Sequence, residues 1–250
     1  MMRTANPALN AKTFRNLPAA VDTDQAMTIQ GTVNKTSIML LLLIISASWT
    51  WGKFFSWGGN SAAVYPWMIG GAIGGFAVAM VTVFKKHWSG ITAPIYAILE
   101  GLFLGGISAV FEAMYPGIVM QAVTLTFGTL FGLLLAYKSG LIKVTENFRL
   151  GLVAATGGIF LVYMASFILG FFGINMPFIH ESGLIGIGFS LFVVVIAALN
   201  LVLDFDFIEQ GAEAGAPKFM EWYGAFGLMV TLIWLYVEML RLLAKLRGRD

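Results

Sequence analysis

Residues 189–203 read FSLFVVVIAALNLVL, a run that carries no charged side chain until Asp204 follows it. Strands of a membrane barrel alternate apolar and polar residues in segments of about ten, whereas a spanning helix needs about 20 mostly apolar residues. Residues 38–47, IMLLLLIISA, form a similar run. A helix satisfies its own backbone hydrogen bonds in lipid. Both runs therefore predict membrane-spanning α-helices.

The same pattern recurs along the chain and predicts seven spanning segments, separated by charged or turn-forming residues. They are Thr36–Trp51, Val64–Phe84, Thr92–Met114, Gly117–Tyr137, Leu150–Gly173, Gly183–Phe205 and Phe219–Leu246. The predicted fold is an all-α integral membrane protein, a seven-transmembrane helix bundle. Residues 1–35 are expected to form a cytoplasmic tail, 36–246 the membrane domain, and 247–250 a short basic tail.

The composition excludes several classes of protein. Of the 250 residues, 58% are hydrophobic and 11% are charged, whereas about one-quarter of a soluble domain is charged. The chain has no cysteine, only His87 and His180 as histidines, and no Gly-x-Ser-x-Gly elbow. We therefore expect the lipid bilayer as a partner, and no enzymatic activity, cofactor or nucleic-acid partner.

The positive charges predict the orientation. With the N-terminus inside, ten lysines and arginines before the last segment face inwards, and Lys53 alone faces outwards. The last four basic residues then lie outside, against the rule: Arg241, Lys245, Arg247 and Arg249. We expect seven crossings with the N-terminus inside, although this conflict is open at the level of sequence.

Acidic residues within the spans are candidate functional groups, because a charge in hydrocarbon is costly. Asn200 and Asp204 are four residues apart and share a helix face, whereas Asp206 points nearly opposite and is expected near the interface. Glu238 lies in the last segment, three residues before Arg241, which offers a local ion pair. Glu100 and Glu112 lie in the third segment, and Glu100 is a secondary candidate.

Asp204 and Glu238 are the acids expected to meet. Two carboxyls in a low-dielectric pocket cannot both ionise cheaply, so such a pair would share a proton near neutral pH. Once deprotonated, the pair would suit a hard cation such as Ca²⁺ in transient binding. A straight last helix starting near Phe219 would instead place Glu238 far from Asp204 in depth, so pairing requires a later start.

Three stretches resemble the Bax inhibitor-1 family, also called the transmembrane Bax-inhibitor-motif proteins: Leu201–Ile208, Leu235–Leu243 and Leu99–Gly105. The opening Asn6–Asn10 resembles a bacterial branch, which implies the bacterial inner membrane. The resemblance implies a seven-helix bundle with the last helix central.

The resemblance also implies an activity, a pH-sensitive calcium leak. Its proton sensor is an acid pair, which falls on Asp204 and on Glu238, where the family has Asp. A basic residue at the end of the second helix would lock the sensor, and Lys85 or Lys86 would take that role.

Two other functions are compatible with the same residues. A proton-coupled carrier for a small solute would use the same buried acids, although the chain shows no clear internal repeat of the kind common in transporters. A membrane protein that modulates another complex would need no transport at all. The sequence names no protein partner.

Overall fold

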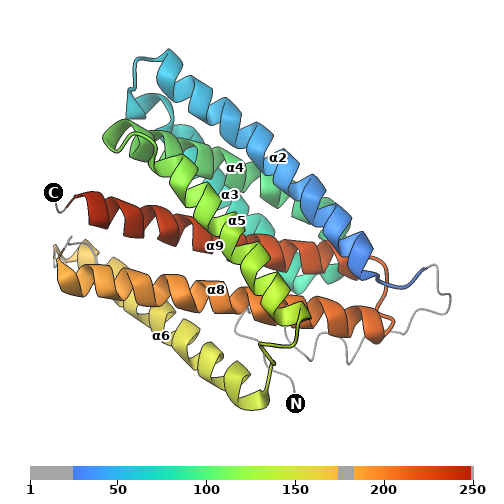
Figure 1. Ribbon diagram of the computed structural model, residues 1–250. Coiled ribbons are helices and arrows are strands. Elements are labelled where there is room, and N and C mark those ends of the chain that lie inside the picture. The colour runs from blue at the N-terminus through green and yellow to red at the C-terminus, as the bar shows by residue number, and fades with distance from the viewer. Residues whose placement is uncertain (1–24, 174–182, 249–250) are drawn as a thin grey trace. The chain divides into compact units, whose positions relative to one another are not determined.

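The computed structural model describes residues 25–173 and 183–248, and in this part of the chain all the long elements are helices (Figure 1). The seven long helices are α2 (Ile29–Ser56), α3 (Tyr65–Phe84), α4 (Ser89–Met114), α5 (Ile118–Lys138), α6 (Glu146–Phe171), α8 (Leu184–Glu213) and α9 (Met220–Arg247). Short 3-10 turns, η2 (Ser61–Ala63) and η3 (Lys86–Trp88), precede α3 and α4. All seven long helices have the length and hydropathy of membrane spans, which confirms the predicted fold class.

Two helices extend well beyond the predicted spans, because polar residues that flank the apolar runs are also helical. α2 begins at Ile29 rather than Thr36, since the Thr28 side chain accepts a hydrogen bond from the backbone of Gly31 and caps the helix. α8 continues past Phe205 to Glu213. The helix therefore begins before the predicted end of the cytoplasmic tail at residue 35, and that boundary stays a prediction. The predicted tail before residue 25 lies outside the described residues.

The contacts divide the chain into two compact units. The α4 unit comprises the described residues 25–119 and Phe207–Val230, and so contains α2, α3, α4, the end of α8 and the start of α9. The α6 unit comprises Met120–Asp206 and the chain from Thr231, and so contains α6, nearly all of α5, most of α8 and the rest of α9. Among the seven spans of the described residues, α9 is the most buried: 61% of its 18-residue apolar stretch lies inside the protein.

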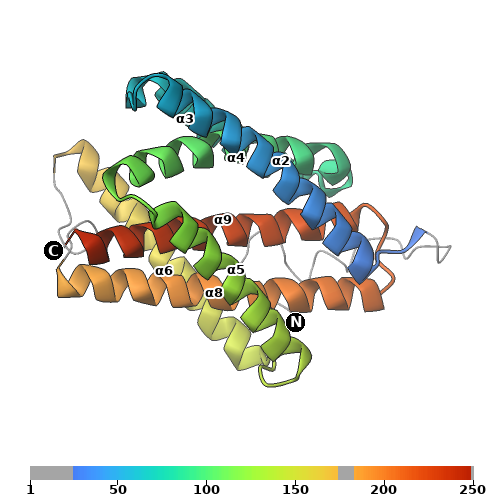
Figure 2. The same cartoon turned by 45° about the horizontal axis from the view of Figure 1, so that its top comes forward.

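Inside the α4 unit, α4 packs against both α2 and α3 (Figure 2). Gly105 faces α2 so closely that an added Cβ would lie 2.1 Å from the carbonyl oxygen of Ala47. Gly71 of α3 approaches α4 in the same way, 2.5 Å from the carbonyl oxygen of Leu99. Small residues at these positions let helix backbones pack closely in a membrane.

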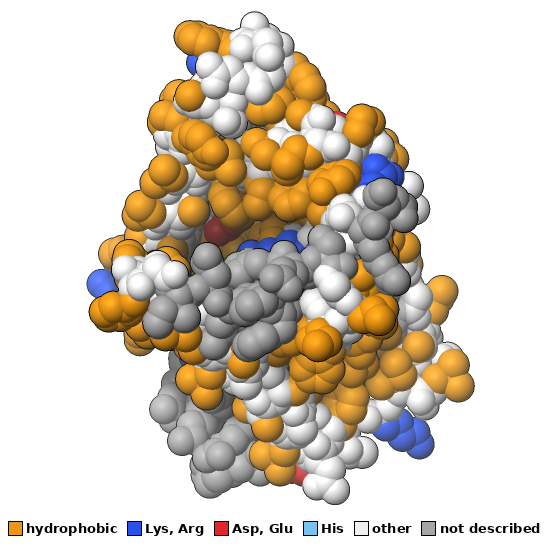
Figure 3. Space-filling view, turned by 90° about the vertical axis from the view of Figure 1, so that its left-hand side faces the viewer, with side chains coloured by type: hydrophobic (Ala, Val, Ile, Leu, Met, Phe, Trp, Pro, Cys, Tyr) orange, Lys and Arg blue, Asp and Glu red, His pale blue; other side chains and the backbone are white. Residues whose placement is uncertain are grey.

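The core of the α6 unit is apolar and joins three helices. Leu152 and Ile159 of α6 pack with Val193, Ile196 and Leu203 of α8, and Trp234 of α9 lies against them. Large hydrophobic side chains also cover much of the outer surface (Figure 3), as expected for helices that face lipid.

Candidate functional site

The two acids predicted as the sensor are both buried in the α6 unit. Asp204 of α8 is 0% exposed and Glu238 of α9 is 1% exposed. Asn200, one turn before Asp204, is also buried, at 2% exposed. The predicted shared face of Asn200 and Asp204 is therefore an inward face of α8.

Glu238 is bonded to three side chains. The hydroxyl of Tyr163 on α6 lies 3.1 Å from both carboxylate oxygens and donates to them. The side chain of Trp234, one turn earlier on α9, also donates to the carboxylate. Arg241 donates from Nη1 to Oε1 at 3.0 Å, which confirms the local ion pair, and its guanidinium lies 5.4 Å from the centre of the Tyr163 ring. The carboxylate thus accepts bonds from a tyrosine, a tryptophan and one half-exposed arginine.

Two further polar contacts join α6 to α8. The amide of Asn200 donates to Thr156 Oγ1 at 3.0 Å and to the backbone oxygen of Ile196 at 2.8 Å. Arg149, in the first turn of α6, forms an ion pair with Asp206. Asp206 therefore lies beside the first turn of α6, and its expected place near the membrane interface stays a prediction. Its arginine partner was not identified from the sequence.

These contacts form a column of polar pairs along α6. Arg149, Thr156 and Tyr163 are seven residues apart, so they lie on one face of the helix at intervals of two turns, about 10 Å. Their partners are Asp206, Asn200 and Glu238. We call these six residues the polar column. The seven-residue spacing on α6 is the sequence signal that could have revealed it.

The contacts of the polar column allow an estimate of how far apart Asp204 and Glu238 lie along the helix axis. Glu238 lies at the level of Tyr163, two turns from the level of Thr156 and Asn200, and Asp204 lies one turn further on. This route gives about 15 Å along the helix axis at 1.5 Å per residue, whereas the direct contacts of Ser190 with Lys245 and of Leu203 with Trp234 give about 8–10 Å. Both are distances along the helix axis and not distances between carboxylate oxygens. The direct pairing of Asp204 with Glu238 stays a prediction.

The start of α9 bears on whether the two acids can meet. The helix begins at Met220 and continues to Arg247, the early start under which the sequence analysis placed Glu238 at a different depth from Asp204. Within residues 25–173 and 183–248, no three His, Asp or Glu side chains are grouped to hold a metal ion.

Comparison with protein families gives one match over nearly the whole chain. The family model described as Bax inhibitor 1 like matches residues 6–248. The chain belongs to the Bax inhibitor 1-like family. The comparison with individually curated proteins gave no significant match.

Lysines predicted to lock the sensor of this Bax inhibitor 1-like protein lie in the α4 unit. There they contact aromatic rings: Lys85 Nζ lies 4.5 Å from the centre of the Trp88 ring, and Lys86 Nζ lies 5.7 Å from that of Tyr223. In the α6 unit, Arg149 pairs with Asp206, and Arg241 pairs with Glu238. The role of Lys85 or Lys86 as a lock stays a prediction.

A buried lysine near the end of α9 is a further group that the sequence did not single out. Lys245 is 9% exposed and donates to Ser190 Oγ at 2.8 Å and to the backbone oxygen of Gly186 at 3.1 Å. Arg247 donates to Gln121 at 2.9 Å. Lys245 and Arg247 are thus hydrogen-bonded to α8 and α5, which belong to the same unit as this end of α9.

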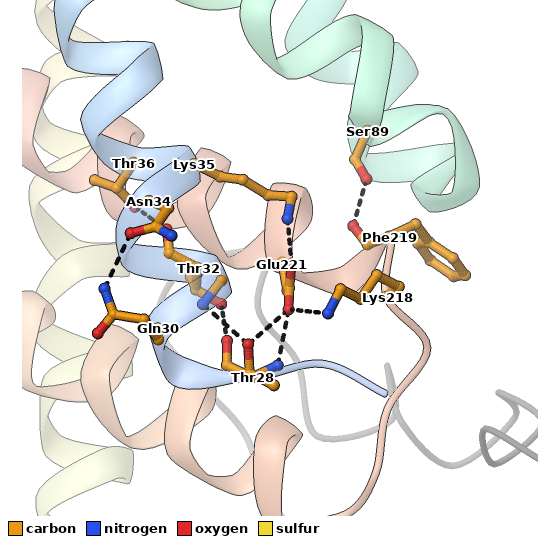
Figure 4. Close-up of polar contacts among 11 residues, drawn as sticks. Thr28, Gln30, Thr32, Asn34, Lys35, Thr36, Ser89, Lys218, Phe219 and Glu221 are labelled. Atoms are coloured by element: carbon orange, nitrogen blue, oxygen red, sulfur yellow. Dashed lines mark hydrogen bonds and ion pairs between the residues drawn. The ribbon is translucent and has the colours of Figure 1, made fainter. Parts of the chain in front are cut away.

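The α4 unit of the Bax inhibitor 1-like chain holds a third buried carboxylate, which the sequence analysis did not identify (Figure 4). Glu221 of α9 is 0% exposed, and its Oε1 accepts from the backbone nitrogen and the hydroxyl of Thr28, both at 2.9 Å. Lys35 forms an ion pair with Oε2, and Lys218 Nζ lies 3.4 Å from Oε1. We call Glu221, Thr28, Lys35 and Lys218 the N-terminal clamp.

Backbone contacts extend the clamp. Met27 donates to the carbonyl of Ala216 at 2.6 Å, and Lys218 donates to the carbonyl of Gln25 at 2.8 Å. Ser89, at the start of α4, donates to the carbonyl of Phe219 at 2.9 Å (Figure 4). The first turns of α2, α4 and α9 therefore lie at one end of the α4 unit.

Proposed function

We propose that this membrane protein is a pH-sensitive leak pathway for cations, calcium included. The observation that supports the proposal is the polar column, which ends in the buried Glu238 within an otherwise apolar helix group that also contains the buried Asp204. Buried ionisable groups in membrane spans commonly mark ion or proton paths. Membership of the Bax inhibitor 1-like family supports the proposal.

Protonation of Glu238 is the proposed switch. The ionised carboxylate accepts from Tyr163 and attracts Arg241, and a proton on it would remove the charge that holds the arginine. An ionised carboxylate also attracts a cation, whereas a neutral acid does not. We therefore expect cation flux to rise with pH as Glu238 and Asp204 ionise.

In this proposal the pathway offers three successive stations rather than one chelating site. A cation would meet Glu238 beside Tyr163, then the Asn200 and Thr156 pair, and then Asp204. Oxygen atoms of carboxylate, amide and hydroxyl groups are suitable ligands for Ca²⁺. Weak binding at separate stations favours passage over retention, as conduction requires.

Calcium flux in proteoliposomes across a pH series tests the function. Glu238→Gln and Asp204→Asn should each lower the flux at high pH and flatten its pH dependence. Glu213→Gln, which changes an exposed acid at the end of α8, is the control and should behave as the parent. Parental behaviour of both test variants would contradict the sensor. Saturable uptake of one solute with a proton gradient would indicate a carrier instead.

We further propose that the protein lies in a bacterial inner membrane with its N-terminus on the cytoplasmic side. The clamp brings the starts of α2 and α9 to one end of the α4 unit, as six complete crossings between them require. Arg241, Lys245 and Arg247 are bonded within their unit, which lowers their weight as free positive charges in the orientation rule.

Because the natural chain has no cysteine, single cysteines can report the orientation. Lys218→Cys should be labelled by an impermeant thiol reagent only from the inner side. Asn60→Cys, between α2 and α3, should be labelled only from the outer side. The reverse pattern would overturn the proposed orientation.

A further inference from the structure

Glu100 is a further acid within a membrane span, and it belongs to the α4 unit, whereas the polar column belongs to the α6 unit. Its carboxyl group rests on the backbone of α3 at Gly75: a Cβ added there would lie 2.7 Å from Oε1 and 3.2 Å from the carboxyl carbon. Gly75 is the eleventh residue of the 20-residue helix α3. The carboxyl group is therefore about 15 Å from either end of that helix, close to the middle of a 30 Å hydrocarbon layer.

The helices packed around Glu100 offer no charge to it. α2 carries no Asp, Glu, Lys, Arg or His between Lys35 and Lys53, and α3 carries none at all. The nearest ionisable group on α4 itself is Tyr96, one turn earlier, which is 4% exposed and packs edge-on against Phe226 of α9.

Two other acids of this unit are bound elsewhere. Glu221 is held in the N-terminal clamp, and the carboxylate of Glu112 accepts from the backbone nitrogens of Gly117 and Val119. Tyr223, the remaining ionisable side chain in the first turns of α9, lies beside Lys86 and Phe207. Among the residues that the structure describes, Glu100 has no hydrogen-bond or ion-pair partner.

We propose that Glu100 is a separate proton-binding site at mid-membrane depth, occupied by a proton in the resting protein. An unpaired carboxylate at this depth would cost several kcal/mol, and a bound proton removes that cost. Gly75 provides the space for the acid group against α3, because any side chain there would occupy it. The site does not depend on the proposed leak, since it belongs to the other unit.

A hydrophobic carbodiimide is the chemical probe for such a site. The carboxyl proton moves to one carbodiimide nitrogen while the carboxyl oxygen bonds to the central carbon, giving an O-acylisourea. Transfer of the acyl group to the other nitrogen then gives a stable N-acylurea. Dicyclohexylcarbodiimide enters the bilayer and needs the protonated acid, so it selects acids that are both deep and neutral.

The experiment treats the full protein in lipid vesicles with dicyclohexylcarbodiimide across a pH series and locates the adduct by peptide mass spectrometry. We expect an adduct on Glu100 that is lost in Glu100→Gln and decreases as the pH rises. A water-soluble carbodiimide should instead modify Glu112, at the end of α4, as the matched control. No adduct on Glu100, or equal modification by the water-soluble reagent, would overturn the proposal.

Infrared spectroscopy provides a second readout that does not depend on reagent access. The carbonyl band of a protonated carboxylic acid should be weaker in Glu100→Gln than in the parent at neutral pH. Glu112→Gln should leave that band unchanged. An identical band in the parent and Glu100→Gln would show that Glu100 is ionised, and the proposal would then be wrong.

Discussion

Helix α9 carries two buried glutamates that differ in what surrounds them. Glu221, in the first turn, is held by two lysines and by both donors of Thr28. Glu238, 17 residues later, is held by the hydroxyl of Tyr163, by the side chain of Trp234 and by one half-exposed arginine. Equal burial therefore does not imply an equal role. The glutamate paired with two lysines is suited to hold helices together, and the one held by two neutral donors and a single half-exposed arginine is suited to exchange a proton.

The largest expected effect comes from removing the clamp carboxylate. Glu221→Ala leaves Lys35 and the donors of Thr28 without their acceptor, and breaking a buried pair in this way costs about 3–5 kcal/mol of unfolding free energy. Chemical denaturation in detergent measures it. Glu213→Ala, at an exposed position, should change the unfolding free energy by less than about 0.5 kcal/mol. Equal stability of the two variants would mean that the clamp is not structural.

Substitution of Gly31, which lies against the Glu221 carboxylate of the N-terminal clamp, should give the next largest change in stability. A Cβ at Gly31 would lie 2.1 Å from Oε1 of Glu221, so Gly31→Ala should displace the carboxylate and lower the unfolding free energy by about 1–3 kcal/mol. Gly52→Ala on the same helix has no atom within 4 Å and should stabilise the protein by up to about 1 kcal/mol. Thermal unfolding of both variants should therefore shift in opposite directions.

Glu238→Gln should affect stability little and function strongly. The amide can still accept from Tyr163, and the lost ion pair with a half-exposed arginine is worth only about 0.2–1 kcal/mol. The pH dependence of calcium flux should nevertheless flatten. If Glu238→Gln instead unfolds the protein as Glu221→Ala does, the contrast between the two glutamates disappears.

Tyr163→Phe should have the smallest effect on calcium flux and the most specific one, because only the pH dependence of the flux should change. Loss of one hydrogen bond costs about 1 kcal/mol of stability. The hydroxyl donates to the carboxylate and so favours its ionised form, which means that its removal should move the half-maximal flux to higher pH. Flux titration in proteoliposomes measures the shift. A shift to lower pH would show that Tyr163 does not act on the Glu238 carboxylate in this way.

Some of the site was predictable from nearby residues. The burial of Asp204 beside Asn200 follows from their four-residue spacing, and the Glu238 pair with Arg241 follows from a spacing of three. The pairing of Asp204 with Glu238 stays a prediction, because helix register depends on where α9 begins. A local pattern does not specify that start to within the one or two turns that decide a contact.

The sequence by itself determined that this is a membrane protein with seven spanning helices, because the length of an apolar run is a local property that the thickness of a bilayer tests directly. Only the tertiary structure decided which polar groups meet. Lys35 and Glu221 are separated by 186 residues, and Arg149 and Asp206 by 57. Such pairs form because a polar group buried in an apolar interior needs a partner, and the packing of helices selects which one lies within reach.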